Sequence, residues 1–385
     1  MMADIKRKVP NLRFKGFTDD WEQRKLGDVV NFFSGLTYHP SDVKNKGYFV
    51  IRSSNIQNNQ IVSADDIFVN KDIINVPNVK QGDIIVVVRN GSRKLIGKHA
   101  QVLTDMPNTV IGAFMTGVRS KSNFYINALL DSDQFQKEIY KNLGATINQI
   151  TIGEFRKMRF IITSGNEAQT IGEFFKKIDT LITLQQRKLD LLKQLKKGFL
   201  QKMFAEKNSK QPVLRFKGFH DDWEQRKLGD ITKTNSFKPY ISEAFDEGKY
   251  EVIQQGDNPI AGYANNAPFK DYKKVTLFGD HTLSLYKPQR AFLVASDGIK
   301  ILSPSLKMDS LFYYYLLEKY KPHSEGYKRH FSILKKNVAF FPVNIAEQTK
   351  ISHCLSNFDS LITLHQRKQN HLKLLKKSLL QQMFM

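Results

Sequence analysis

Residues 12–28 read LRFKGFTDDWEQRKLGD, and residues 214–230 read LRFKGFHDDWEQRKLGD. Sixteen of the seventeen positions are identical, and the two tryptophans of the 385-residue chain, Trp21 and Trp223, lie inside the two copies. Self-similarity at a fixed separation is the mark of a duplicated structural unit. The chain is therefore expected to build one framework twice.

A second repeat begins downstream of each copy. Residues 166–204 align without gaps with residues 346–384, and both share the patterns D-x-L-I-T-L-x-Q-R-K and K-K-x-x-L-Q-x-M-F. Apolar residues recur in both at spacings of three and four without a proline, which is the pattern of an amphipathic helix. About 38 helical residues would span roughly 57 Å, so a coiled coil is predicted, and the two helices are expected to pack antiparallel.

The apolar stripes supply the residues expected to form the seam between the helices or to dock partner proteins. Both stripes are interrupted at the same place by a polar residue, Gln185 and His365. Such a residue either fixes the register of a coiled coil or faces solvent, and the sequence leaves both alternatives open. The expected seam and docking residues are Ile178, Leu181, Leu192, Phe199, Phe358, Leu361, Leu375 and Leu379, together with Trp21 and Trp223.

The material between the repeated parts differs in length and sequence. From Trp21 to Glu167 is 146 residues, whereas from Trp223 to Glu347 is 124. The two intervening segments show no comparable sequence match, which indicates a shared scaffold that carries two different recognition surfaces. Each is predicted to be a mixed α/β domain, with strands within 47–52, 82–88, 250–253, 274–278 and 291–295 and late helices near 123–143 and 310–320.

The expected fold class is therefore α+β, with two mixed α/β globular domains joined by two long antiparallel helices and an internal pseudo-two-fold repeat. The predicted divisions are residues 1–165, 166–204, 205–345 and 346–385, alternating globular domain and helix.

Composition favours a nucleic-acid partner. Lysine and arginine total 59 against 37 aspartates and glutamates, a net charge of +22. Such an excess points to a polyanion, although general surface basicity remains an alternative. A single cysteine, Cys354, excludes an internal disulfide and fits a reducing compartment. No apolar run approaches the roughly 18 residues of a membrane span, and the first residues lack a signal-peptide pattern, so a cytoplasmic location without membrane contact is expected.

The chain closely resembles the specificity subunit of type I restriction–modification systems. The resemblance rests on the paired W-E-x-x-x-L-G-D motifs, on the dissimilar intervening segments and on the paired helices with the D-x-L-I-T-L pattern. The resemblance covers essentially the whole chain. It implies that each globular domain reads one half of a bipartite double-stranded DNA target. It also implies that the helices set the spacing and dock two methyltransferase subunits for adenine N6 methylation, and that restriction–translocation subunits then join. S-adenosylmethionine, ATP and magnesium would belong to those partners, with no cofactor on this chain.

Loops of the first intervening segment carry side chains suited to DNA. Gly91 and Gly97 let a backbone approach closely, arginine can read guanine and asparagine adenine, and lysines suit phosphates. An ordinary basic hairpin is the alternative. The candidates are Arg89, Asn90, Ser92, Arg93, Lys94, Lys98, Asn148 and Gln149.

The second segment offers a different set, at glycine-containing turns and in a basic, aromatic stretch. Taken alone, each residue at the turns is better suited to forming the turn than to reading a base, and only the set of them at loop positions indicates DNA contact; the basic, aromatic stretch suits backbone or base contact. The candidates are Gln255, Asn258, His281, Thr282, Asp297, Lys300, Tyr327, Lys328, Arg329, His330 and Ser332. Because the two sets differ, an asymmetric target is expected.

The sequence holds no convincing catalytic motif. Residues 91–98, GSRKLIGK, differ from a phosphate-binding loop, because five residues separate the glycines and His99 stands where Ser or Thr should bind magnesium. The pairs Asp280-His281 and His353-Cys354 lack further ligands at zinc spacing. A non-catalytic subunit is expected; a sequence-specific DNA-binding regulator or a coiled-coil adaptor remains the alternative.

Overall fold

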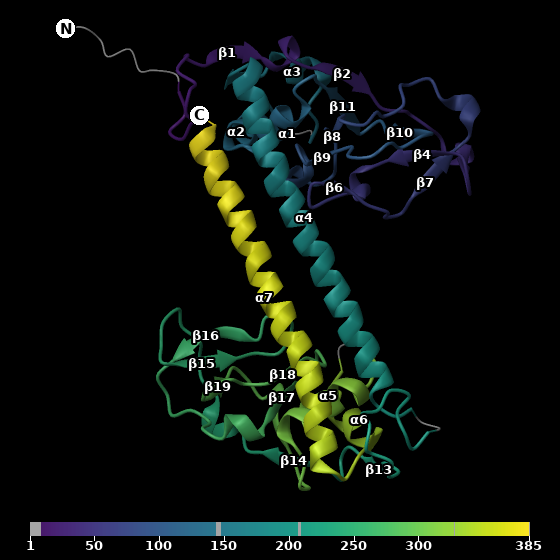
Figure 1. Cartoon of the computed structure of the whole chain (residues 1–385), viewed down its shortest axis with the longest axis vertical. Helices are drawn as coiled ribbons and strands as arrows, with labels where there is room; N and C mark the ends of the chain where they lie inside the picture. Colours follow the sequence, from purple (N-terminus) through teal and green to yellow (C-terminus); the bar gives the residue numbers. More distant parts are fainter. Residues whose placement is uncertain (1–8, 144–147, 207–208, 327, 385) are drawn as a thin grey trace, which may run out of the picture. The chain divides into compact units, whose positions relative to one another are not determined.

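The computed structural model describes residues 9–143, 148–206, 209–326 and 328–384 (Figure 1). The chain divides into two compact units. Unit 1 comprises Met1–Gln186 and Arg367–Met385, and unit 2 comprises Arg187–Gln366.

Two long helices run through both units. Helix α4 (Gly165–Lys202) begins in unit 1 and ends in unit 2, and helix α7 (Ile345–Met383) takes the opposite course. The predicted helices over 166–204 and 346–384 are thus confirmed. Each unit contains the first part of one helix and the last part of the other.

The two helices are antiparallel within each unit. In unit 1, Lys376 Nζ lies 2.5 Å from Asp179 Oδ1, and Gln369 on α7 hydrogen-bonds to Gln186 on α4. In unit 2, the rings of Phe199 and Phe358 lie 5.1 Å apart. Partner numbers on α7 fall as numbers on α4 rise, so the predicted antiparallel pairing is confirmed.

Unit 1 holds two four-stranded sheets and two short ribbons. Strands β2, β11, β8 and β9 form one antiparallel sheet in that order, and β10, β4, β7 and β3 form the other, in which β10 and β4 are parallel. The strands are β1 (Glu22–Lys25), β2 (Asn31–Ser34), β3 (Val43–Lys44), β4 (Tyr48–Ile51), β5 (Ile56–Gln57), β6 (Gln60–Ile61), β7 (Ile67–Val69), β8 (Ile84–Val87), β9 (His99–Gln101), β10 (Thr109–Ile111), β11 (Met115–Arg119) and β12 (Arg159–Ile162). The remaining helices are α1 (Asn123–Asp131), α2 (Asp133–Asn142) and α3 (Ile152–Lys157).

Unit 2 repeats this topology with fewer strands. Strands β14, β20, β17 and β18 form an antiparallel sheet, and β16, β15 and β19 form a second sheet in which β15 and β19 are parallel. The strands are β13 (Glu224–Lys227), β14 (Thr232–Asn235), β15 (Tyr250–Ile253), β16 (Ile260–Ala264), β17 (Thr276–Gly279), β18 (Leu285–Tyr286), β19 (Phe292–Val294), β20 (Ile299–Pro304) and β21 (Val338–Phe341). The helices are α5 (Ser310–Tyr320) and α6 (Phe331–Lys336).

The intervening segments therefore share a fold despite their unlike sequences. In both units one of the two central strands of the antiparallel sheet, β8 or β17, is buried at every position. A buried strand requires apolar residues of suitable shape, and many different residues meet this requirement. A comparison of residue identities therefore does not reveal that β8 and β17 are equivalent strands. Each predicted strand run contains a strand.

One expected helix is divided. The segment near 123–143 forms α1 and α2, which are separated at Ser132. Ser132 has an extended backbone, with φ −77° and ψ 158°, and its hydroxyl donates to the carbonyl of Leu129 at 2.6 Å. This local bond competes with the helical pattern and ends α1.

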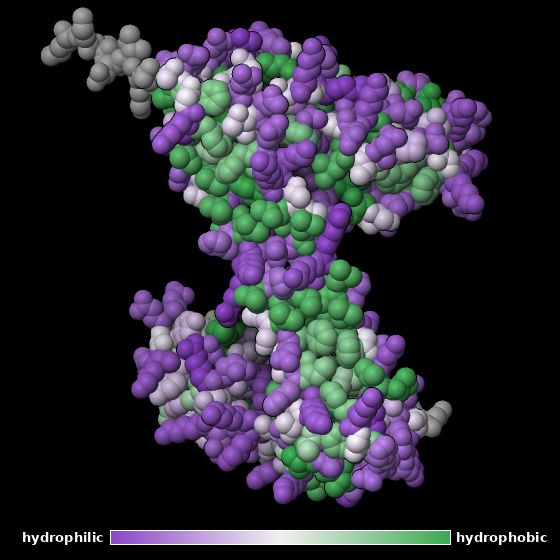
Figure 2. Space-filling view, in the orientation of Figure 1, coloured by the Kyte–Doolittle hydropathy of each residue, from purple (hydrophilic) through white to green (hydrophobic). Residues whose placement is uncertain are grey.

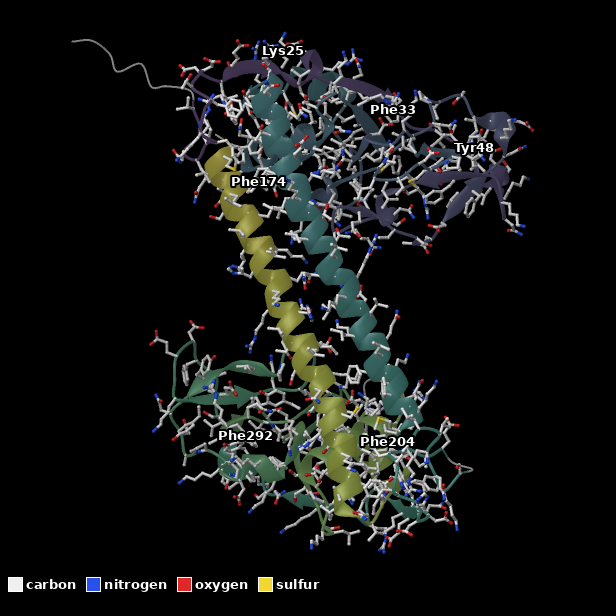
Figure 3. All side chains as sticks on the ribbon, in the orientation of Figure 1. Lys25, Phe33, Tyr48, Phe174, Phe204 and Phe292 are labelled. Carbon is white, nitrogen blue, oxygen red and sulfur yellow. The ribbon has the colours of Figure 1, made fainter. Side chains whose placement is uncertain are left out.

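The repeated ends pack on each other in each core. In unit 1 the ring of Phe384, beyond α7, lies 6.1 Å from Trp21, and in unit 2 the ring of Phe204, beyond α4, lies 6.1 Å from Trp223. Phe204 is labelled in Figure 3. Both tryptophans are 2% exposed, so the repeated W and M-F residues form the helix-to-domain contact of each unit.

Candidate nucleic-acid interface

The candidate residues of unit 1 lie side by side at one end of its antiparallel sheet. The connection from β8 to β9 carries residues 89–98. Its Asn90 N–H donates to the carbonyl of Asn148 at 3.2 Å, and Arg89 forms an isolated bridge with Gln149. The two segments predicted from the sequence are therefore brought together.

Within this loop, the side chains divide between solvent and internal support. Arg89, Ser92, Arg93, Lys94 and Lys98 are exposed. The amide groups of Asn90 and Asn148 make internal bonds: Asn90 donates to Ser53 Oγ at 3.0 Å and accepts from the Ser92 N–H, while Asn148 donates to the carbonyl of Gly91 at 3.1 Å. The asparagines thus shape the loop on which the cations are displayed.

An aromatic residue absent from the sequence prediction belongs to the same surface. Phe114, between β10 and β11, is 52% exposed, and the Arg89 guanidinium lies 4.9 Å above its ring. This cation–π contact orients the arginine. In the sequence, the only signal was a phenylalanine between two strands. The sequence alone does not show whether such a side chain is exposed or buried.

The candidates of unit 2 converge from four segments. The carbonyl of the Gln255 side chain accepts the His281 N–H at 3.0 Å, and the Asp280 N–H donates to Gly298 at 2.8 Å. Arg329 Nη2 lies 3.3 Å from Asp297 Oδ2. Thr282, Asn258, Lys328 and Ser332 are exposed beside them, whereas Gln255, His281 and Lys300 are half-buried.

Two of the candidates in unit 2 stand apart. His330 is 0% exposed. Its ring Nε2 accepts the backbone N–H of Glu325 at 3.2 Å, and its backbone N–H donates to the carbonyl of Asp280 at 2.7 Å. It supports the loop from within and presents no surface for DNA. Tyr327 lies outside the described residues.

The two sets occupy equivalent connections of the shared topology. The β8–β9 connection corresponds to β17–β18, β10–β11 to β19–β20, and the segment before α3 to that before α6. Backbone bonds repeat as well. Val88 donates to Phe114 and accepts from Ile150, as Asp280 donates to Gly298 and accepts from His330. Both sets of equivalent loops therefore carry Arg and Lys, but unit 1 adds Gln149 and the β8–β9 cations, whereas unit 2 adds His281, Thr282 and Asp297.

The helices expose apolar residues outside their seam. Of the expected seam residues, Ile178 is buried, and Leu192, Phe199, Phe358 and Leu379 are half-buried. Leu181, Leu361 and Leu375 are 48%, 42% and 42% exposed, so they face away from the seam. Of the two polar interruptions, His365 is 6% exposed and Gln185 is half-buried, so neither is simply solvent-facing.

An apolar groove lines unit 2 where the repeated segments meet. It has a volume of about 410 Å³ and lies between the end of α4 and Leu214. Two of the leucines that line it, Leu191 and Leu195, are exposed. Figure 2 shows apolar surface on this unit. In unit 1, Leu375 and Leu12 are exposed at the positions that match Leu195 and Leu214, and the exposed Leu374 occupies the position of Gln194.

No cluster of three or more His, Cys, Asp or Glu side chains is arranged to hold a metal ion in the described residues. In the same part of the chain, no helix combines the length and apolar character that crossing a bilayer requires.

Comparison with known proteins identifies relatives over most of the sequence. A family model described as the type I restriction modification DNA specificity domain matches residues 18–194 and 220–374. The type I restriction enzyme StySPI specificity subunit of Salmonella potsdam is 26% identical over 227 residues, 55% of this chain and 48% of that protein. The match thus spans about half the length of that relative. A putative type I restriction enzyme MjaX specificity subunit from Methanocaldococcus jannaschii is 24% identical. That match covers 94% of this chain and 92% of the relative.

The fold has a counterpart among solved structures. The S subunit of a type I restriction–modification system from M. genitalium superimposes with a TM-score of 0.68 at 14% identity, covering 98% of this chain and 99% of that one. Since the family model spans both repeats and most of the sequence, the chain belongs to the type I restriction modification DNA specificity family, as a non-catalytic specificity subunit.

Proposed function

We propose that each unit reads one half of an asymmetric, bipartite double-stranded DNA target. The observation that carries the proposal is the equivalence of the loop sets. The same connections of the same sheet display different side chains in the two units. If both units dock on DNA with the same geometry, their different side chains would recognise two different short base sequences, which we call half-words.

Within unit 1, Arg89 is the base reader that we favour, because its guanidinium is exposed and already oriented by Phe114. Arginine makes bidentate bonds to guanine. Gln149 offers an amide beside it, Asn148 shapes the loop through its bond to Gly91, and Lys94 and Lys98 suit phosphates. In unit 2, Arg329 and Asp297 lie together at the surface, where a carboxylate can accept from cytosine.

The helices would dock the catalytic partners. Two exposed leucines of each unit occupy matching repeat positions, Leu195 and Leu214 in unit 2 and Leu375 and Leu12 in unit 1. Two equivalent apolar faces suit two identical subunits. We propose two methyltransferase subunits for adenine N6 methylation, joined by restriction subunits. S-adenosylmethionine, ATP and magnesium would be bound by those partners, and the complex would act in the cytoplasm. Residues 1–165 and 205–345 would be the recognition domains and residues 166–204 and 346–385 the helical regions.

The test is adenine methylation across the genome of source cells, read by single-molecule sequencing with and without this gene. Deletion should erase methylation from one split, asymmetric motif. Arg89→Ala with Gln149→Ala should alter one half-word alone, and Arg329→Ala with Asp297→Ala the other. If a variant in one unit changed both half-words, the assignment of one word to each unit would be wrong. Unchanged methylation, together with sequence-specific binding by the purified chain, would favour a DNA-binding regulator instead.

A further inference from the structure

A buried lysine of unit 1 joins three elements through an ion triad with two half-buried aspartates. Lys376 of α7 is 8% exposed. Its Nζ lies 2.6 Å from Asp131 Oδ2, at the end of α1, and 2.5 Å from Asp179 Oδ1 on α4. One ammonium therefore ties the helix pair to the globular part of the unit.

Unit 2 contains the equivalent triad. Lys196 of α4 lies 3.1 Å from Glu318 on α5 and 2.8 Å from Asp359 on α7. The two lysines are the first residues of the repeated K-K-x-x-L-Q-x-M-F pattern, and the helix aspartates are the first residues of the repeated D-x-L-I-T-L pattern. Lys197 and Lys377, the second lysines, are exposed.

The third member of each triad comes from the intervening segments. Asp131 follows Leu129 and Leu130, and Glu318 follows Leu316 and Leu317; all four leucines are 0% exposed. The Leu-Leu-acid end of α1 thus matches that within α5, in segments without general sequence similarity. The acid is placed by two core leucines in both units.

The triads are suited to defining register more than to adding stability. Burial acts to lower the pKa of Lys376, but Asp131 and Asp179 raise it above its ordinary value. Burial likewise acts to raise the pKa of Asp131, but His99 and Lys376 outweigh it and hold this pKa below its usual range. Burying ions largely cancels their attraction, and the best-attested role of such groups is to specify register. A slip of one heptad would carry the lysine about 10.5 Å away from its carboxylates.

We propose that Lys376 and Lys196 are positioning residues that fix the helix register and the seating of each recognition domain on its helices, and so restrict the spacer between the two half-targets. This inference rests on the proposed function. The lysines contact no DNA; they act through Asp131 and Asp179, or through Glu318 and Asp359.

The experiment uses the intact system in its source cells and a plasmid library. Each plasmid carries the two half-words of the wild-type motif, separated by the native spacer or by one shorter or longer by up to three base pairs. Methylation of each spacer class is read by single-molecule sequencing. The variants are Lys376→Met and Lys196→Met, the conservative Lys376→Arg, and Lys376→Met with Asp131→Asn and Asp179→Asn, which removes the three charges of the triad together. Lys373→Met, at an exposed position on α7, is the matched control.

The lysine-to-methionine and neutralised variants are expected to raise methylation at non-native spacers at least five-fold relative to the native spacer, with the half-words unchanged. Lys376→Arg and Lys373→Met should keep the wild-type spacer profile. A merely structural role would lower methylation at all spacers in proportion and leave the profile unchanged, which would overturn the proposal. Loss of all methylation in both the methionine and the neutralised variants would overturn it as well, because a register device is dispensable for folding once its charges are removed together. If wild-type cells show no split motif, the proposed function itself fails, and the inference fails with it.

Discussion

Glu167 and Glu347 occupy the same position of the two repeats, yet their bonds differ. Both carboxylates bind an arginine of the repeated N-terminal stretch, Arg13 or Arg215. Glu167 also accepts from Trp21 at 3.1 Å and from the Thr163 hydroxyl at 2.7 Å. Val343 stands at the corresponding position, four residues before Glu347. Unit 1 therefore has the more extensively bonded carboxylate.

This difference predicts that Glu167→Gln lowers the free energy of unfolding by an amount that depends on pH. Burial acts to raise the pKa of Glu167, but bonds from Arg13 and Thr163 outweigh it and lower the pKa. When the pKa of a carboxylate is lower in the folded protein than in the unfolded chain, its charge stabilises the fold. This contribution is fully present above the pKa of the unfolded chain, about 4.3, and is lost as the pH falls through the pKa of the folded protein. The variant should lower the free energy of unfolding by about 2 kcal/mol at pH 7, the magnitude of a hydrogen bond to a charged group, and the difference from wild type should shrink below about pH 4.

Urea unfolding followed by tryptophan fluorescence measures this difference. Glu173→Gln, at an exposed position on the same helix, should change stability by less than about 0.5 kcal/mol. A loss on Glu167→Gln that is equally large at pH 7 and pH 3.5 would show that the carboxylate charge is not what stabilises the contact.

Arg89 and Lys94 differ in the kind of DNA contact that we assign to them. Arg89→Ala should weaken binding of the assembled complex by about 1–3 kcal/mol and relax the preference at one base pair. Lys94→Ala should weaken binding to all sequences alike and reduce the slope of log affinity against log salt by about 1. Fluorescence anisotropy with a panel of singly substituted duplexes distinguishes the two; a uniform loss for Arg89→Ala would reassign that arginine to a phosphate.

Single residues also mark how far the sequence could be interpreted. The loops were identifiable from glycines and basic residues, but which side chains face solvent was not. His330 holds the place of the buried Ile150 in the other unit, because both donate to the equivalent backbone carbonyl. A histidine in a basic stretch resembles a surface residue until its backbone partner is known.

At the scale of elements, the helices present one apolar face to each other and another to solvent. Leu195 and Leu375 occupy matching repeat positions and are 50% and 42% exposed. Substituting either by aspartate should leave the seam intact, because neither residue is buried in it. If these leucines dock the methyltransferase, each single variant should retain one partner subunit and the double variant none.

Co-purification with the methyltransferase, with mass measurement of the complex, counts the bound subunits. Lys193→Asp is the control, because it lies two residues from Leu195 and so on the opposite face of α4. Two subunits retained by the double variant would exclude these leucines as the docking surface.

The long helices were predictable because their apolar period extends over many turns. The break at Ser132 was not, since it depends on one hydroxyl that bonds to Leu129. The common topology of the intervening segments was also hidden, because burial at β8 and β17 is retained with different residues. Periodicity therefore identified the framework, whereas the equivalence of the reading loops required the strand order.

At the scale of the whole molecule, one set of contacts occurs twice. Strands β1 and β12 pair over four residues, from Glu22 opposite Ile162, and β13 and β21 pair over four residues, from Glu224 opposite Phe341. The aromatic contacts and the ion triads recur in the same way. Each intervening segment is thus bounded by the same strand pair and is held by the same kinds of contacts.

This equivalence predicts that the intervening segments can be exchanged. Replacing residues 29–158 by residues 231–337 places the second segment between β1 and β12, whose register matches that of its own strand pair. With two copies of one reading domain on a pseudo-two-fold framework, the split target should become an inverted repeat of the second half-word. The reciprocal replacement should give an inverted repeat of the first. Single-molecule sequencing of adenine methylation in cells carrying each chimera identifies the new motif.

The graft should be tolerated because each segment brings its own carboxylate for the lysine of the helix. Asp131 lies inside the first segment and Glu318 inside the second, and each follows two buried leucines. Lys376 would therefore meet an acid in either arrangement. Glu318→Leu within the grafted copy supplies the internal control, since it removes that acid alone. A chimera that still methylates the original asymmetric motif would contradict the assignment of one half-word to each segment, whereas an inverted-repeat motif would locate the reading determinants between the two repeated strands.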